Sequence, residues 1–111
     1  MRFRELIRAF KVLVPCLFSR SYYYVNAAGR GDVEAVQRHL RAGVAVDVKS
    51  LGDMTAMRWA CYHGHADVVR VLLAHGADPS GGLFEAGRMH REPIMALLQQ
   101  AAEAAKERNI L

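Results

Sequence analysis

Five side chains in the middle of the chain carry groups that bind metals or react as nucleophiles: Cys61, His63, His65, His75 and Asp78. Thiolate, imidazole and carboxylate groups are the ligands that zinc takes in proteins, so a metal site is the first chemistry to consider. The spacing matches no zinc motif, because the two cysteines of the chain form no CxxC pair. The sequence also has no phosphate-binding loop, no GxSxG and no HExxH. It therefore predicts no catalytic residue, no metal and no cofactor.

The elements that must position these side chains belong to one small domain. The 111 residues are 52% apolar and 23% charged, close to the ~45–50% and ~25% of ordinary globular chains, which excludes a disordered chain. The apolar run at residues 12–18 is interrupted by Pro15 and is shorter than the ~20 residues of a membrane span. We expect a single soluble or membrane-peripheral domain.

The net charge of +4 belongs to residues 1–20, which carry five basic side chains and one acidic one. Basic and acidic side chains balance in residues 21–111. A nucleic-acid-binding domain usually spreads its basic side chains over one face, so the neutral body predicts no nucleic-acid partner. We therefore divide the chain into a basic segment at 1–20 and a folded domain at 21–111.

The basic segment also has an apolar stripe at helical spacing, made by Phe3, Leu6, Ile7, Phe10 and Val14. An Arg-rich, acid-poor amphipathic helix is typical of a mitochondrial transit peptide and of a helix that lies on a membrane surface. A short helix that covers an exposed edge of the core has the same pattern. These alternatives stay open at this stage, and a mitochondrial location is our first expectation, with a cytoplasmic one next.

An internal repeat of 33 residues organises the folded domain. Ala27, Gly31, Val36, Leu40 and Gly43 match Ala60, Gly64, Val69, Leu73 and Gly76. Because glycine ends helices readily, the pattern predicts helices over 25–30, 33–42 and 55–63, and a fourth between His65 and Gly76. Val69 and Leu73 are expected in the core between the second and third copies.

A third copy follows, with helices predicted over 83–88 and from 92 to about 108, but it is shorter. Ala86 lies only 26 residues after Ala60, so seven residues are missing from the connection between Gly76 and Leu83. Ala-rich sequence after Leu98 favours one long closing helix.

Residues 55–79 resemble an ankyrin repeat, TPLHxAAxxGHxxVVxLLLxxGADxN, most closely from Ala60 to Asp78. Two residues depart from the pattern, because Ala56 and Arg58 stand where the family has proline and histidine. The resemblance implies an all-α stack of helix-turn-helix units. Only residues 44–54 are long enough for a full β-hairpin finger of the kind that projects from such stacks. An N-terminal amphipathic helix is expected to precede the stack.

The same resemblance implies a protein-binding module whose contacts fall on the finger and on the exposed side of the first helix of a repeat. Carried over by position, the partner-binding residues are Lys49, Leu51, Met54, Trp59, Tyr62 and His63. The alternative is that Met54 and Trp59 pack under the finger as ordinary core. The resemblance also places His65 where the family imidazole bonds backbone groups, and Cys61 at a small core position, which argues against the metal site.

We therefore expect a non-enzymatic accessory or scaffold subunit of a larger, possibly mitochondrial assembly. The alternative is a peripheral membrane protein held on anionic lipid through residues 1–18. Membrane or assembly contacts are in either case expected from Phe3, Leu6, Ile7 and Phe10.

Overall fold

The computed structural model describes residues 2, 4 and 19–110, with side chains up to Arg108. The expected N-terminal amphipathic helix, with Phe3, Leu6, Ile7 and Phe10, lies outside these residues. Residues 19–110 form six α-helices, namely α2 (Arg20–Arg30), α3 (Val33–Arg41), α4 (Ala56–His63), α5 (Ala66–Ala74), α6 (Ser80–Arg88) and α7 (Glu92–Ile110).

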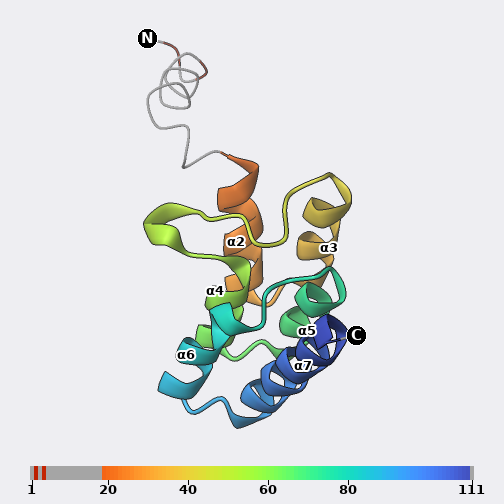
Figure 1. Ribbon diagram of the computed structural model, residues 1–111. Helices are drawn as coiled ribbons and strands as arrows, with labels where there is room; N and C mark the ends of the chain where they lie inside the picture. The colour runs from red at the N-terminus through yellow and green to blue at the C-terminus, as the bar shows by residue number, and fades with distance from the viewer. Residues whose placement is uncertain (1, 3, 5–18, 111) are drawn as a thin grey trace.

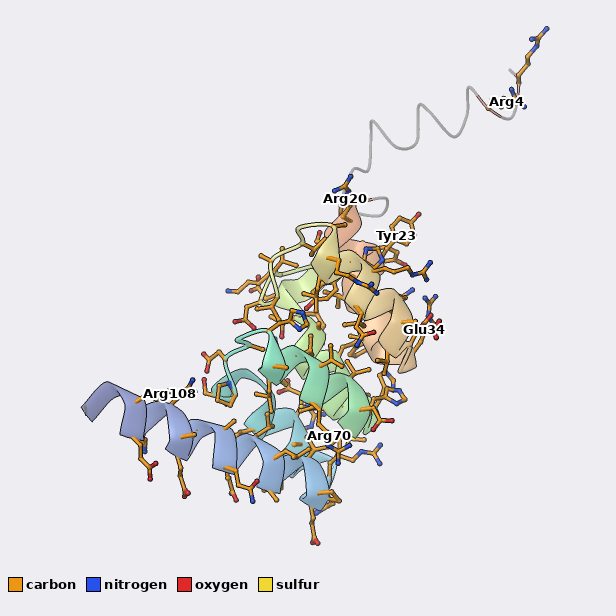
Figure 2. The ribbon with its side chains drawn as sticks, turned by 90° about the vertical axis from the view of Figure 1, so that its right-hand side faces the viewer. Arg4, Arg20, Tyr23, Glu34, Arg70 and Arg108 are labelled. Carbon is orange, nitrogen blue, oxygen red and sulfur yellow. The ribbon has the colours of Figure 1, made fainter. Side chains whose placement is uncertain are left out.

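The helices form three antiparallel pairs that stack on one another in chain order. Helices α2, α4 and α6 pack side by side in one layer, and α3, α5 and α7 pack in a second (Figure 1). Helix α7 is the longest and extends sideways beyond the repeats, where it carries Arg108 (Figure 2). The all-helical stack predicted from the repeat is therefore confirmed.

The ends of the helices follow from local sequence signals. The side chains of Ser19, Asp32 and Thr55 each accept a hydrogen bond from a backbone N–H in the first turn of the helix that follows. Gly31 and Gly64 end the first helices of the first two pairs with φ of 76° and 79°, a region that other residues rarely enter. Because Ser19 caps it, α2 begins five residues earlier than the predicted range 25–30.

The core lies between the two layers and runs through all three pairs. Its largest fully buried side chains are Tyr24, Met57, Leu72, Leu98, Val36, Val68, Val69 and Cys61. The expectation for Val69 is confirmed, but the one for Leu73 is wrong. Leu73 is only half-buried, and the adjacent Leu72 is the leucine of α5 that faces the core.

The prediction of a β-hairpin finger is also wrong, because this segment has a different secondary structure. The connection between α3 and α4 contains no strand among the described residues; it has turns and one short 3₁₀ helix, η2 (Leu51–Asp53). A single two-stranded hairpin is marginal in water without a neighbouring strand. Only residues 75–79 connect α5 to α6, so the next repeat cannot supply a second finger beside it.

Candidate functional site

The metal-binding cluster suggested by residue types is not assembled. In the part of the chain that the structure describes, no three His, Cys, Asp or Glu side chains come together around a metal position. The His65 ring nitrogen Nε2 hydrogen-bonds the Gly29 carbonyl at 3.0 Å, as the resemblance implied. His75 Nδ1 bonds the Val71 carbonyl at 2.9 Å. His65 therefore ties the start of α5 to α2, and His75 bonds a carbonyl in the last turn of its own helix, α5.

Cys61 is fully buried, and its thiol donates a hydrogen bond to Met57 Sδ at 3.8 Å. Burial, together with the negative charge of Glu85, raises the pKa of the Cys61 thiol from 9.0 to about 12. Because the thiolate is the reactive form, Cys61 is a core residue and not a nucleophile.

This burial predicts a loss of stability in alkaline solution. The folded chain holds Cys61 neutral up to a pKa of about 12, whereas the unfolded chain releases the proton near 9.0. The contribution to stability is therefore complete below pH 9.0 and is lost as the pH rises from there toward 12. Urea unfolding measured across this range should show the decline, and Cys61→Ala should make it shallower. An identical slope in the variant would show that the thiol is not the group responsible.

The main candidate site is a groove between the first two repeats, with a volume of about 260 Å³. We call it the α2–α4 groove. Its walls come from α2, from the connection that contains η2, and from α4. The lining residues are Tyr22, Val25, Asn26, Ser50, Leu51, Met54 and Trp59. None of these side chains is charged, and Leu51 is 49% exposed, so the groove presents an apolar and aromatic surface.

Hydrogen bonds hold the wall of the groove that contains η2. The hydroxyl of the buried Tyr24 donates to the Val46 carbonyl at 2.8 Å, which ties the connection to α2. The Ser50 N–H donates to the Met54 carbonyl at 2.8 Å and closes the turn around η2. Asp53 has a φ of 59°, a left-handed conformation that aspartate tolerates better than most residues.

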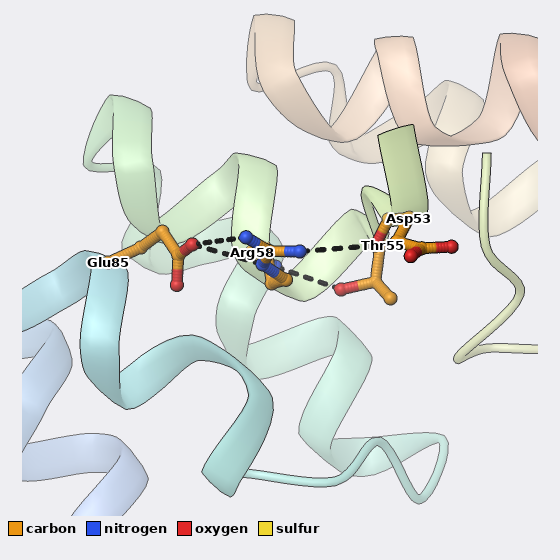
Figure 3. A network of polar contacts seen from close by, with 4 residues as sticks. All are labelled: Asp53, Thr55, Arg58 and Glu85. Carbon is orange, nitrogen blue, oxygen red and sulfur yellow. Dashed lines mark hydrogen bonds and ion pairs between the residues drawn. The ribbon is translucent and has the colours of Figure 1, made fainter. Parts of the chain in front are cut away.

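Arg58 fixes the same wall from the side of α4 (Figure 3). Its Nη1 donates to the Asp53 carbonyl at 3.2 Å, and its backbone N–H donates to Thr55 Oγ1 at 3.2 Å. On the other side, Nε and Nη2 donate to Glu85 Oε1 at 3.0 and 2.7 Å. The residue that departs from the family histidine thus joins the groove wall, α4 and the buried carboxylate of α6.

Trp59 forms the floor between α2 and α4 because Gly29 lets it approach. A Cβ atom at position 29 would lie 2.1 Å from Cδ1 of the indole, so only glycine fits against the ring. Trp59 is partly buried against the core and also lines the groove. The two alternatives considered for this residue, core and surface, therefore both apply.

Tyr62 and His63 extend this surface along α4. The Tyr62 ring stacks on Trp59 with centroids 5.5 Å apart and an angle of 20°. The His63 ring meets the edge of Trp59 at 4.6 Å and that of Tyr62 at 5.1 Å. We call these three residues the aromatic cluster. Large aromatic side chains that are partly open to solvent are typical of protein interfaces.

The structure thus brings five of the six predicted residues together. Leu51, Met54 and Trp59 line the groove, and Tyr62 and His63 adjoin it through the aromatic cluster. Lys49 is exposed in the same connection but is not among the residues that line the groove.

Sequence reasoning missed the groove residues Tyr22, Val25, Asn26 and Ser50. The repeat contained a signal for one of them, since Asn26 lies 33 positions before Trp59 and so occupies the equivalent place on α2. Ser50 lies in the connection that contains η2, outside the helices, so the helical repeat gave no such signal for it.

Among the described residues, no helix has the length and apolar character to cross a membrane.

Comparison with known proteins agrees with this architecture. The profile of the family described as "Ankyrin repeats (3 copies)" matches residues 24–108. Ankyrin repeat domain-containing protein 40 of Mus musculus and that of Homo sapiens are each 40% identical over 54 residues, which is 48% of this chain and 15% of theirs. An ankyrin repeat protein of fowlpox virus (strain NVSL) is 33% identical over 55 residues, 50% of this chain and 7% of its own.

The similarity to these relatives therefore covers a small part of much longer proteins. Ankyrin repeats are generally modules of protein–protein interaction, and the family is typically non-enzymatic. Since the family profile spans most of the sequence and the three helix pairs stack in the order it requires, the chain belongs to the ankyrin-repeat family.

Proposed function

We propose that this protein is a non-enzymatic interaction module that binds a protein partner through the α2–α4 groove and the aromatic cluster beside it. The observation that carries this proposal is the convergence of uncharged side chains from three separate segments on one open groove of about 260 Å³. The family's general role in protein interaction supports it.

The chemistry of the groove indicates what such a partner presents. Its lining is apolar and aromatic, and it includes the polar groups of Asn26 and Ser50. A groove of this size accommodates one or two side chains rather than a whole helix. We expect a loop or extended segment of the partner to insert a large apolar or aromatic side chain, which is how interface hot spots are usually built.

The proposed setting is that of a small accessory subunit in a larger assembly. Three stacked units are near the lower limit for a stable repeat domain, because each unit buries its apolar faces only against its neighbours. A bound partner would stabilise so short a stack. A mitochondrial location belongs to the same proposal and rests only on the basic, amphipathic sequence of residues 1–20.

Two alanine variants test the proposed surface. Leu51→Ala and Tyr62→Ala should each weaken binding by more than about 1 kcal/mol, because both side chains lose water on binding. Lys49→Ala should mainly change the association rate and its dependence on salt. Co-purification with the tagged chain and mass spectrometry would identify the partner, and calorimetry with that partner would measure the affinities.

Phe84→Ala provides the matched control for these variants. Phe84 is an exposed aromatic residue, 69% accessible, on α6. In the repeat register it occupies the position of Arg58, which faces the following repeat, so Phe84 marks the open C-terminal end of the stack. Normal binding by Leu51→Ala and Tyr62→Ala, with a loss in Phe84→Ala, would place the partner on the end of the stack and refute the groove.

A membrane surface is the competing setting for residues 1–18. Binding of the chain to anionic vesicles that falls with added salt would favour it, since screening weakens attraction between the basic segment and lipid. Docking of a partner in the groove should keep most of its affinity in added salt, because no side chain that lines the groove is charged, although the contribution of Lys49 is screened.

A further inference from the structure

We infer that the partner segment that enters the α2–α4 groove is acidic, and that its carboxylates bind a row of basic residues at the ends of α2, α4 and α6. The row consists of Arg30, His63 and Arg88, and we call it the helix-end strip. The inference rests on the proposed function and adds to it the charge of the partner.

The first argument is the place of the three side chains in the fold. Each is the last residue of its helix, and each is exposed. Because α2, α4 and α6 lie side by side in chain order, their ends form a row (Figure 1). In the repeat register Arg30 takes on α2 the place that His63 has on α4. Arg88 takes on α6 the place of Tyr62, so the strip continues the aromatic cluster into the repeats on either side.

Contacts between α2 and α4 place Arg30 beside His63. The residues on either side of Arg30 are glycines, and a side chain on them would collide with Trp59 or with His65 of the next repeat. The His63 ring contacts the same two rings, with centroids 4.6 Å from Trp59 and 6.2 Å from His65. Arg30 therefore lies at the edge of the aromatic cluster.

The second argument is that the two arginines of the strip lack an acidic partner. Two ion pairs form among the residues that the structure describes, and neither includes Arg30 or Arg88. Helices α2, α4 and α6 contain one carboxylate, that of Glu85, which is 5% exposed and already bound by Arg58. These helices thus expose positive charge without exposed negative charge, which complements an acidic segment.

Other carboxylates near these helix ends belong to the second layer. Asp32 accepts a hydrogen bond from the first turn of α3, and Asp67 of α5 pairs with Arg70. Glu34 and Glu92 are exposed in the first turns of α3 and α7. All four complement the positive ends of the second helices. They repel an acidic segment that crosses to that layer, and so they keep it along the first helices.

Charge also sets the direction of the segment. The η2 connection leads into α4, at the opposite end of this helix from the strip, and it carries Asp47 and Asp53 against one cation, Lys49. The adjacent Arg58 guanidinium is taken by Glu85 and by the Asp53 carbonyl. Excess positive charge therefore lies at the strip. The segment places its apolar side chain in the groove and its carboxylates toward the helix ends.

The span of the strip sets the length of the segment. Neighbouring helices pack about 8–10 Å apart, so the ends of α2 and α6 are about 16–20 Å apart. An extended chain rises about 3.3 Å per residue, so about five or six residues cover the strip. An acidic residue near each end of such a stretch meets Arg30 or Arg88, and arginine binds a carboxylate through two parallel hydrogen bonds. These ion pairs add a salt-sensitive part to the affinity of the groove.

The strip suits a polypeptide better than a nucleic acid. Nucleic-acid binding relies on neutralising several phosphates at once. Two unpaired arginines beside one imidazole are few for that purpose, whereas they match the carboxylates of a short acidic stretch.

Helix α3 supplies a matched control for the strip. A basic residue at the end of a helix also stabilises the helix, because it faces the negative end of the helix dipole. Helix α3 ends in the same way, with Arg38 and Arg41 exposed in its last turn. These two arginines lie in the second layer, so their loss affects a helix end and leaves the proposed contact intact.

The test selects peptides on the full chain from a displayed library of random sequences of about ten residues, long enough for the apolar anchor and the strip. Enriched peptides should contain a large apolar or aromatic residue and, within about six residues of it, more Asp and Glu than the unselected library. On a chain with Arg30→Gln and Arg88→Gln the acidic excess should disappear while the apolar residue remains. Arg38→Gln combined with Arg41→Gln should leave both features unchanged.

A synthetic copy of the most enriched peptide then gives the size of the effect, measured by fluorescence polarisation with the full chain. Arg30→Gln and Arg88→Gln should each weaken its binding about two- to fivefold, the range of an exposed ion pair. The two substitutions on α3 should not change the affinity.

Enriched peptides with the apolar residue but no acidic excess, or an acidic excess that survives in the Arg30→Gln and Arg88→Gln chain, would overturn the inference and leave the proposed function standing. A selection that enriches no peptide, or peptides that Leu51→Ala and Tyr62→Ala bind normally, would instead contradict the proposed function. Tighter binding of an oligothymidylate than of the peptide, lost in the same arginine variants, would show that the strip binds nucleic-acid phosphates, and would also overturn the inference.

Discussion

Leu72→Ala should lower the free energy of unfolding by about 2–5 kcal/mol, the range found when a fully buried leucine is truncated and a cavity remains. Leu72 has no exposed surface and lies on α5, the middle helix of its layer, which packs against both α3 and α7. Small domains have about 5–15 kcal/mol of stability in total. The substitution should therefore remove a large part of the stability of this short stack, as measured by urea or thermal unfolding.

Leu73→Ala is the matched control, because it makes the same change at the next position of the same helix. Leu73 is half-buried and lies at the surface near the loop that follows α5, so less apolar area is lost. We expect a clearly smaller destabilisation. A larger effect for Leu73 than for Leu72 would mean that α5 is rotated relative to the packing described above.

The second large effect should come from Arg58→Met, which keeps the unbranched apolar stem of the side chain but removes the guanidinium and its charge. Glu85 is only 5% exposed, and in this variant its carboxylate would lose its ion pair with Arg58. Breaking a buried ion pair costs about 3–5 kcal/mol. Because the Arg58 side chain is 33% exposed and water reaches it, we expect a smaller loss than this, about 2–3 kcal/mol.

Two further variants isolate the cause of this loss. Arg58→Met combined with Glu85→Gln should recover part of the stability, because a neutral amide is easier to bury than an unpaired charge. Arg70→Ala breaks the other ion pair described, with Asp67, in which both side chains are largely exposed, and it should cost less than about 1 kcal/mol. No recovery in the double variant would show that Arg58 acts by packing alone.

Most of the fold could be predicted from the sequence, because the repeat and its glycines mark the helix ends. The error at Leu73 has a simple cause. Leu72 and Leu73 are adjacent and equally apolar, and the repeat matched Leu73 with Leu40, which is itself only half-buried. Identity between repeats therefore did not distinguish a fully buried position from one at the edge of the core.

The early start of α6 at Ser80 was also missed. Asp78 lies in the loop before α6. Its side chain accepts hydrogen bonds from the backbone N–H and from the hydroxyl of Ser80, at 3.0 and 2.8 Å. This local turn leads directly into the helix, although two glycines follow it. Glycine is a poor helix former, so the sequence favoured a later start at Leu83.

The site was predicted only in part, because several of its residues are far apart in the sequence and meet only in the folded chain. Leu51, Met54 and Trp59 were found because the family pattern places contacts on the finger and on the first helix. The pairing of Arg58 with Glu85 joins residues 27 positions apart, and neither residue alone indicates the other. The wall contributed by Tyr22 and Val25 belongs to the first copy of the repeat, in which residues 22–25 share no letter with the TPLH of the family pattern, so the pattern gave little guidance there.

The central claim is that the partner binds the face formed by the α2–α4 groove and the aromatic cluster. Its most direct test places the same photo-reactive aromatic amino acid at Tyr62, Tyr23 or Phe84 of the full chain. Tyr23 lies on α2, in the first repeat, and Phe84 lies on α6, in the last. Both side chains are exposed and mark the two open ends of the stack, so the three positions compare the proposed face with both alternatives. We predict that irradiation in cells links a defined partner to position 62 and to neither end. Adducts of that partner from position 23 or 84, with none from position 62, would contradict the account.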